Sequence, residues 1–431
     1  MSKEENRKNF SKYVSQNILG MIGFSCYVLA DSYFISIAKG ADGLTALNLV
    51  MPLYSIIFSI GEMIGVGSAI RYAISKIKKD ADVDDYFWNA LIWCILSSML
   101  FVFAGIFFSA DIMRVLGADE HIVAVGNNYT KIFMCFAPMF MCNYVTNAFV
   151  RNDGAPGIAM SATLFSSLFN IVFDYILMFP MNLGMEGAAL ATALSPIIGM
   201  GICSIHFFSK KSSVRLVVCK PSVRKLVAGC QLGVSAFVGE MSSAVITLAF
   251  NFVILKLAGN VGVAAYGVVA NIAIVTTAVF NGVAQGSQPL ISSCFGRGDK
   301  DGCTQLKRMG YTTAFVLAAV MYSILFIFAG QFVAVFNSEG SEMLRLYATE
   351  GVKLYFIGIF FAGINIVGGG AFSATEDAFK AAVVSVARGF VLILGAVFVM
   401  SAFFGMTGVW LAYAVAEGIT TFIMLVMAMR V

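Results

Sequence analysis

The sequence predicts an all-α integral membrane protein with twelve transmembrane helices in two pseudo-symmetric six-helix lobes. Two observations predict this fold class: the composition is strongly apolar, and the sequence repeats itself once. Apolar residues make up 59% of the chain and charged residues 12%, against roughly 45–50% and about 25% in soluble domains. With a mean hydropathy of +0.86, the apolar side chains are too numerous for one water-soluble core.

The repeat relates the first half of the chain to the second. The recurring positions are Gly43 with Gly262, Gly67 with Gly286, and the strings 184–187 (Gly-Met-Glu-Gly) and 405–408 (Gly-Met-Thr-Gly). The offset between the halves stays within two residues. Two similar halves are typical of secondary transporters, in which a central cleft opens alternately to either side of the membrane.

Twelve apolar stretches are each long enough for the roughly 20 residues that a spanning helix needs. They are 13–38, 44–71, 88–109, 121–150, 157–180, 185–209, 226–256, 262–294, 310–336, 346–372, 378–403 and 406–429. The first is too long, and its flanks too polar, for a cleaved signal peptide. We therefore expect an N-lobe over 1–212 (helices one to six), a connection over 213–225 and a C-lobe over 226–431 (helices seven to twelve).

The positive charges predict the orientation in the membrane. Of the 28 Lys and Arg residues, all but six fall in segments on the same side as the N-terminus. The six on the other side are Lys39, Arg114, Lys131, Lys256, Arg345 and Lys353. Because cytoplasmic loops are enriched in positive charge, both termini and the connection 210–225 are expected in the cytoplasm, and the chain in the cell (inner) membrane. The net charge of +4 then needs no nucleic-acid partner, and we expect a monomer in the lipid bilayer.

Several kinds of chemistry are not indicated. The nine Cys lack metal-ligand spacing, and the two His, His121 and His206, lie on different predicted helices. A zinc site or a nucleophile–His pair is therefore not expected. No glycine-rich string has the P-loop pattern, so ATP hydrolysis is not indicated. We expect no enzyme activity and no cofactor.

Acidic residues inside the spans are the main functional candidates, because a charge at membrane depth is costly and normally faces a cavity or a partner. There are five: Asp31, Glu62, Asp174, Glu240 and Glu417. Asn170 lies four residues before Asp174 and so shares one helix face with it. At 1.5 Å per residue, Asp31 and Asp174 both lie roughly 26 Å into outward-running helices.

Two more oxygen-bearing side chains, Tyr129 and Thr192, fall at a similar depth on inward-running helices. Together with Asp31, Asn170 and Asp174 they could ligate Na⁺, a hard cation that prefers oxygen donors. The two carboxylates could instead share a proton, since close negative charges repel each other. A third possibility is that each acid pairs separately with a polar neighbour.

The other acids have structural alternatives. Glu240 is either a cavity charge that attracts cationic substrates or the acceptor of a hydrogen bond from Ser or Asn. Glu62 lies in a glycine-rich span, and Glu417 has Arg388 as a possible partner. Structural roles are favoured for Glu62 and Glu417.

Over essentially its whole length the chain resembles the multidrug and toxic compound extrusion (MATE) family, in a prokaryotic branch. The motifs that carry this resemblance are Ala30-Asp31, Asn170-x-x-x-Asp174, Gly184-x-x-Gly187 with Thr192, and Gln285-Gly-Ser-Gln-Pro289. The resemblance implies a cation-coupling site at Asp31, Tyr129, Asn170, Asp174 and Thr192. If the ion is Na⁺, its ligands would be Asp31, Asn170, Asp174 and Thr192. The resemblance also implies substrate contacts at Asn143, Asn147 and Glu240.

Two departures from the family pattern stand out. Many members have a proline in the first helix about four turns before the Asp, whereas residues 13–17 here read Tyr-Val-Ser-Gln-Asn. A proline bend cannot be assumed, and Gly20 could soften the helix instead. The second half also lacks the acid that some branches carry on helix ten.

The expected function is secondary active export of amphipathic or cationic organic compounds in exchange for Na⁺ or H⁺. One alternative is a lipid-linked precursor flippase of the same superfamily, which would need a basic central cavity. An intramembrane enzyme would need a nucleophile and a base. A channel would not need the two-half repeat.

Overall fold

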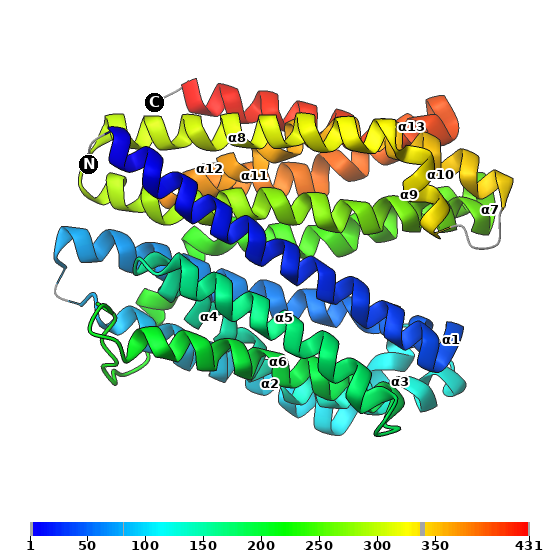
Figure 1. The fold of residues 1–431 in the computed structure, drawn as a ribbon, viewed down its shortest axis with the longest axis horizontal. Helices are drawn as coiled ribbons and strands as arrows, with labels where there is room; N and C mark the ends of the chain where they lie inside the picture. Colours follow the sequence, from blue (N-terminus) through cyan, green and yellow to red (C-terminus); the bar gives the residue numbers. More distant parts are fainter. Residues whose placement is uncertain (1–2, 81, 337–340, 430–431) are drawn as a thin grey trace. The chain divides into compact units, whose positions relative to one another are not determined.

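The structure, a computed structural model, describes residues 3–80, 82–336 and 341–429, and it contains helices and no strand over these residues (Figure 1). This confirms the predicted all-α class. The elements are α1 (Lys3–Lys78), α2 (Asp85–Val115), α3 (Glu120–Cys135), α4 (Ala137–Asn152), α5 (Pro156–Met178), α6 (Gly184–Phe207), α7 (Val223–Gly296), α8 (Lys300–Ile327), α9 (Ala329–Phe336), α10 (Glu342–Tyr355), the 3-10 turn η1 (Phe356–Gly358), α11 (Ile359–Ala374), α12 (Ala378–Val386), the π-helix η2 (Ala387–Val391) and α13 (Leu392–Met429).

Packing divides the chain into two compact units. The N-unit comprises Ser15–Phe237 and Ser292–Asp299; the C-unit comprises the start of α1 up to Val14, Val238–Ile291 and the described residues from Lys300 onward. The unit boundaries therefore fall inside α1 and α7. The lobe boundaries expected at residues 212 and 226 stay a prediction.

Glycines break three helices that are too long for one membrane crossing. A 74-residue helix such as α7 would be roughly 110 Å long, several times the ~30 Å hydrocarbon layer. The backbone leaves the helical region at Gly40 in α1 (φ 58°), Gly259 in α7 (φ 62°) and Gly405 in α13 (φ 57°). Gly184, the first residue of α6, also has a positive φ of 51°. Only glycine adopts this conformation readily.

Each of these glycines opens a Gly-x-x-Gly string, and equivalent strings of the two halves pack alike. A Cβ at Gly187 would lie 2.8 Å from the carbonyl carbon of Leu177. At the equivalent Gly408, a Cβ would collide with the backbone carbonyl of Met400. In both halves the second glycine lets the incoming helix pass directly over the backbone of the preceding one. The sequence repeat is therefore also a repeat of local backbone structure.

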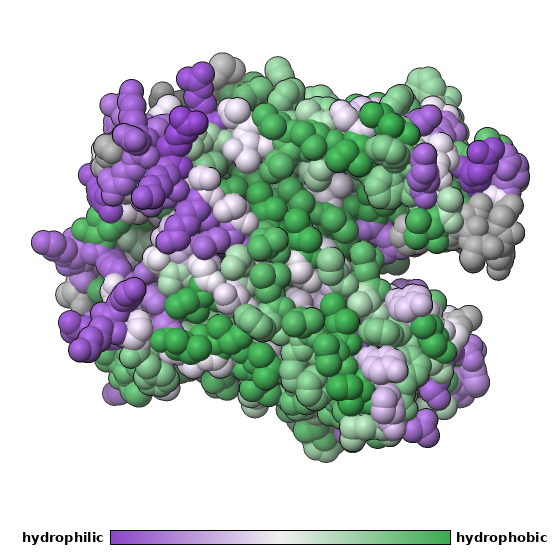
Figure 2. All heavy atoms as spheres, viewed as in Figure 1, coloured by the Kyte–Doolittle hydropathy of each residue, from purple (hydrophilic) through white to green (hydrophobic). Residues whose placement is uncertain are grey.

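Within the described residues, nine helical segments are long and apolar enough to cross a membrane, and the bent pair α3–α4 would be a tenth. The predicted stretch 121–150 is thus not one straight helix: α3 and α4 meet at Phe136 at an angle of 46°. Pro138, in the first turn of α4, has no N–H to continue the α3 hydrogen-bond ladder, which explains the break. Figure 2 shows hydrophobic side chains over most of the visible surface and hydrophilic ones gathered near the helix ends.

The first helix has no break near its start. Its backbone is helical from Lys3 to Lys39, and the only non-helical residue in α1 is Gly40. Gly20, which could have softened the helix, lies within this unbroken stretch. It is in ordinary van der Waals contact with α5, since a Cβ there would lie 3.7 Å from the Met160 Cα.

Candidate functional site

The two acids of the predicted coupling site lie inside the N-unit. Asp31 on α1 is 7% exposed and Asp174 on α5 is fully buried. They are close enough to interact electrostatically. The other predicted members, Tyr129 on α3, Asn170 on α5 and Thr192 on α6, are also buried. The structure therefore brings all five residues into one buried region.

Asn170 links the two sides of this cluster. Its side-chain amide can hydrogen-bond to both Asp174 and Thr192 in one orientation. In this orientation the amide nitrogen donates to Asp174 Oδ2 at 3.1 Å. Its oxygen then accepts from the Thr192 backbone N–H and hydroxyl, each at 3.2 Å. The four-residue spacing of Asn170 and Asp174 on α5 makes this bridge possible, because both side chains project from one helix face.

One oxygen of each carboxylate has no protein partner. Asp31 Oδ1 and Asp174 Oδ1 are buried and accept no hydrogen bond from any described residue. An unpaired carboxylate oxygen is expensive away from water. A bound cation or a proton would relieve this cost, and the surrounding donor set consists of oxygen atoms, which suit Na⁺. In the described parts of the chain, no group of three or more His, Cys, Asp or Glu side chains is arranged to hold a metal ion.

Tyr54 is a further member of the cluster. Its hydroxyl hydrogen-bonds to that of Tyr129, and both phenols lie within electrostatic range of Asp31 and Asp174. Stacking on Phe133, with ring centroids 3.6 Å apart, fixes the position of the Tyr54 ring. The sequence did not identify Tyr54, whose one available signal was a hydroxyl inside an apolar span.

The two asparagines predicted for substrate binding are half-buried on α4. Asn147 donates to the Ala159 carbonyl at 3.1 Å and to the Thr163 hydroxyl at 3.2 Å. It therefore holds α4 against α5. Asn143 Oδ1 is buried and accepts no hydrogen bond from the described residues. Their contact with a substrate stays a prediction.

The remaining acids divide into paired and unpaired groups. Glu417 pairs with Arg388 at 2.7 Å, which confirms the expected partner, and Glu62 lies within electrostatic range of the buried Arg151. Glu240 on α7 differs, because no hydrogen bond or ion pair between described residues involves it. The alternative of a hydrogen bond from Ser or Asn is therefore not what the described residues show.

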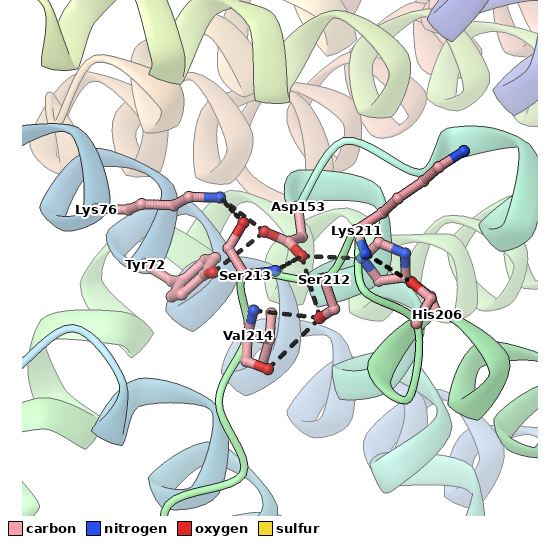
Figure 3. Close-up of polar contacts among 9 residues, drawn as sticks. Tyr72, Lys76, Asp153, His206, Lys211, Ser212, Ser213 and Val214 are labelled. Atoms are coloured by element: carbon pink, nitrogen blue, oxygen red, sulfur yellow. Dashed lines mark hydrogen bonds and ion pairs between the residues drawn. The ribbon is translucent and has the colours of Figure 1, made fainter.

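A second polar centre surrounds Asp153, the residue that follows α4 (Figure 3). Its carboxylate is fully buried and accepts from Lys76 at 2.8 Å, from His206 at 2.9 Å and from the Ser213 backbone N–H at 2.8 Å. The Tyr72 hydroxyl adds a bond of 3.2 Å. Burial alone would raise the pKa of Asp153, but the bonds from Lys76, Ser213 and His206 outweigh it and hold the pKa below its usual value.

This Asp153 centre clamps the connection between the halves onto the N-unit. Residues 212–214 reach it from the segment after α6, while Lys76 and Tyr72 come from α1. Further along, the Ser222 backbone N–H donates to Asn89 Oδ1 at 2.7 Å. The sequence did not identify Asp153, since only the folded chain shows that the connection returns to it.

The chain is similar to multidrug transporters over nearly its whole length. A family model described as MatE matches residues 17–176 and 236–399, more than half of the chain. The multidrug export protein MepA of Staphylococcus aureus (strain MRSA252) is 27% identical over 414 residues, 93% of this chain and 89% of MepA.

Two solved structures share the fold. An outward-facing multidrug resistance MATE family transporter of the MOP superfamily has a TM-score of 0.92 at 20% identity, covering 99% of this chain and 96% of that one. A MOP superfamily transporter from Pyrococcus furiosus has a TM-score of 0.91 at 20% identity with the same coverage, and its binding pocket is described as having reverse polarity that suggests a different function. One fold thus carries different pockets. From the match of the family model, the chain belongs to the MatE family of multidrug and toxic compound extrusion (MATE) transporters.

Proposed function

We propose that this chain is a secondary active multidrug exporter that moves amphipathic, cationic organic compounds outward in exchange for Na⁺ or H⁺. The observation that carries the proposal is the pair of buried carboxylates, Asp31 and Asp174, each with an oxygen that no described residue satisfies. The name of the relative MepA, a multidrug export protein, supports the substrate class. The chain is a multi-pass membrane protein, as its apolar helices and its family require.

The proposed architecture has twelve spans in two six-helix lobes. Nine apolar segments and the bent pair α3–α4 give ten spans. Dividing α7 at Gly259 and the last apolar segment at Gly405 gives two more. We place both termini in the cytoplasm of a cell-membrane protein that works as a monomer.

In the proposed mechanism, the coupling ion binds at Asp31, Asn170, Asp174 and Thr192, with Tyr129 and Tyr54 closing the site. An ion can shift the protein between two conformations only if it binds one of them more tightly. Neutralising the two carboxylates changes how α1, α5 and α6 pack and so favours drug release. One cation moving inward across 100 mV supplies about 2.3 kcal/mol, and an ion gradient adds to this.

Glu240 is the proposed determinant for cationic substrates, together with Asn143 and Asn147. A carboxylate without a protein partner inside an apolar helix attracts positive charge. Of the alternatives, a flippase is not favoured by the multidrug exporters among the relatives, and it would need basic rather than acidic groups in the spans. An enzyme would need reactive groups that the described residues do not bring together.

The decisive experiment is drug export from proteoliposomes in which Na⁺ and pH gradients are imposed separately. Export should follow one of the two gradients. Asp31→Asn and Asp174→Asn should each abolish coupled export while leaving a folded protein. Asp111→Asn is the matched control, because Asp111 is 62% exposed and pairs with Arg114. Gradient-driven export by either site variant at the wild-type rate would refute the assignment.

A further inference from the structure

A buried ion pair lies in the C-unit, where Arg388 of η2 meets Glu417 of α13. The guanidinium Nη2 donates to Glu417 Oε1 at 2.7 Å, and Nε donates to Oε1 at 3.1 Å and to Oε2 at 3.3 Å. The Glu417 side chain is 3% exposed and that of Arg388 17%. Two charges this far from water depend on each other.

The rest of the Glu417 environment also suits an ionised carboxylate. Asn365 Nδ2 donates to Glu417 Oε2 at 2.7 Å and to its backbone carbonyl at 2.9 Å. Thr421 in turn donates to Asn365 Oδ1 at 3.0 Å, which fixes the amide. An ionised carboxylate only accepts hydrogen bonds, and every neighbour named here donates to it directly or holds a donor in place.

The backbone around Arg388 has an unusual form. Residues 387–391 form a π-helix, in which one extra residue per turn changes the direction of the following side chains; such turns are frequent at functional sites. Gly389 lets this turn approach α7, since a Cβ there would lie 2.5 Å from the Ser242 Cβ. The π-turn thus packs against α7 while Arg388 reaches Glu417.

The Asp31–Asp174 pair and Glu417 therefore differ in how their charge is met. In the N-unit, Asp31 and Asp174 each keep an unsatisfied oxygen, and no Lys or Arg among the described residues bonds to them. In the C-unit, Glu417 already has a cation of the protein itself. We propose that Arg388 is a built-in counterion that takes the place of an external coupling cation at Glu417, so that the transported ion binds in the N-unit and not at this site. This inference rests on the proposed ion-coupled export and adds to it the residue that limits the number of ions per cycle.

Removing the charge of Arg388 should then create a new cation site. Glu417 would keep the Asn365 hydrogen bond but lose its counterion. A buried carboxylate without a counterion must take up H⁺ or Na⁺. The other titratable groups in electrostatic contact with this pair are Tyr355, Tyr413 and, through them, Tyr266. Model phenols titrate near pH 10, so they stay protonated between pH 5 and 8.

Trp410 can report on the C-unit that contains this site. It is fully buried in α13 and stacks with Tyr266 at a centroid distance of 6.5 Å. The other two tryptophans, Trp88 and Trp93, lie on α2 in the N-unit. We therefore define a background protein in which Trp88 and Trp93 are both replaced by Phe. It also carries Asp31→Asn and Asp174→Asn, which remove the proposed ion site of the N-unit. Its tryptophan fluorescence comes from Trp410.

In this background, Arg388→Met should make Trp410 fluorescence depend on pH or Na⁺ between pH 5 and 8. The background protein itself and Arg388→Lys should show no such dependence. A folded Arg388→Met protein without a new cation response would overturn the proposal. A response already present in the background and removed by Glu417→Gln would overturn it as well.

Two variants keep the test decisive if Arg388→Met does not fold. Arg388→Gln removes the charge but keeps hydrogen-bond donors, and the same fluorescence result is expected. The double variant Arg388→Met/Glu417→Gln removes both charges in the otherwise unaltered chain, and should export with the wild-type number of ions per drug; a changed ratio contradicts the proposal. The fluorescence measurement uses neither drug nor gradient. A result that contradicts the proposed export function can therefore be distinguished from one that contradicts the role of Arg388.

Discussion

Asn128 and Glu186 hydrogen-bond to each other across α3 and α6, with Nδ2 donating to Oε1 at 2.7 Å. The second half has a similar bond with donor and acceptor exchanged: the hydroxyl of Thr407, the equivalent of Glu186, donates to Glu350 Oε1, also at 2.7 Å. Glu186 and Thr407 lie inside the equivalent Gly-x-x-Gly strings. Each of these two strings is thus hydrogen-bonded to a preceding helix of its own half.

We expect that the Asn128–Glu186 hydrogen bond can also form when its two residues are exchanged. Asn128→Glu alone places two carboxylates together and should lower the unfolding temperature, and Glu186→Asn alone should have a smaller effect. The double variant Asn128→Glu/Glu186→Asn should recover most of the loss, with a coupling energy on the order of 0.5 kcal/mol, as for other exposed pairs. Thermal unfolding in detergent measures this cycle, and strictly additive effects would show that the bond contributes nothing.

The Asp153 centre should hold the connection against proteolysis. Asp153→Asn replaces one of the two acceptor oxygens by an amide nitrogen. Either Lys76 on Oδ1, or His206 and the Ser213 N–H on Oδ2, then lose their acceptor, at a cost on the order of 2 kcal/mol. The connection contains Lys210, Lys211 and Arg215, so trypsin should cleave this variant faster. Asp80→Asn, at an exposed position, is the control. Equal cleavage rates in the two variants would count against the clamp.

The same centre should respond to acid in a defined direction. The pKa of Asp153 is lowered in the folded chain, so its stabilising effect is fully present above the unfolded value of about 3.9 and is lost as pH falls through the lower folded value. Hydrogen exchange of the Ser213 amide, corrected for its intrinsic rate, should therefore stay slow from pH 7 to pH 5 and accelerate only below about pH 4. Acceleration already at pH 6 would show that Asp153 is not the controlling group.

Close approach at the Gly-x-x-Gly strings predicts which glycines of α13 tolerate a side chain. Gly408→Ala places a methyl group against the Met400 carbonyl, and Gly405→Ala strains a positive-φ backbone, which typically costs about 1–3 kcal/mol. Both should lower the unfolding temperature. Gly395→Ala is the matched control on the same helix, since a Cβ there meets nothing within 4 Å, and should be neutral or slightly stabilising.

The sequence predicted those parts of the molecule that depend on regular helix geometry. Asp31, Asp174 and Thr192 could be placed at one depth because a helix rises by a fixed amount per residue. The bend at Phe136 and the π-turn at Arg388 depend on local backbone breaks that composition does not reveal. Asp153 was missed for another reason: its partners on α1, on α6 and after α6 converge only through tertiary packing. Tyr54 was missed for the same reason, because its hydroxyl meets that of Tyr129 only in the folded chain.

Tyr54 leads to the final prediction. Its hydroxyl is the hydrogen-bond partner of the Tyr129 hydroxyl, and one of the two phenols must donate to the other, which leaves the acceptor's own proton free to point toward the carboxylates. Tyr54→Phe keeps the ring and its stacking on Phe133 but removes the hydrogen bond that orients the two hydroxyl groups. We expect several-fold weaker Na⁺ or H⁺ binding with an unchanged unfolding temperature.

The matched control is Tyr175→Phe, because Tyr175 is 55% exposed on α5 and should leave ion binding unchanged. Ion-dependent intrinsic fluorescence of the otherwise unaltered chain measures the affinity of both variants. Tyr129→Phe should weaken binding at least as much, since Tyr129 is the more buried partner. Tyr54→Phe could instead bind the ion as tightly as the wild type while Tyr129→Phe binds it more weakly. The bond between the two hydroxyl groups would then not matter for ion binding, and Tyr129 would act on the carboxylates without Tyr54.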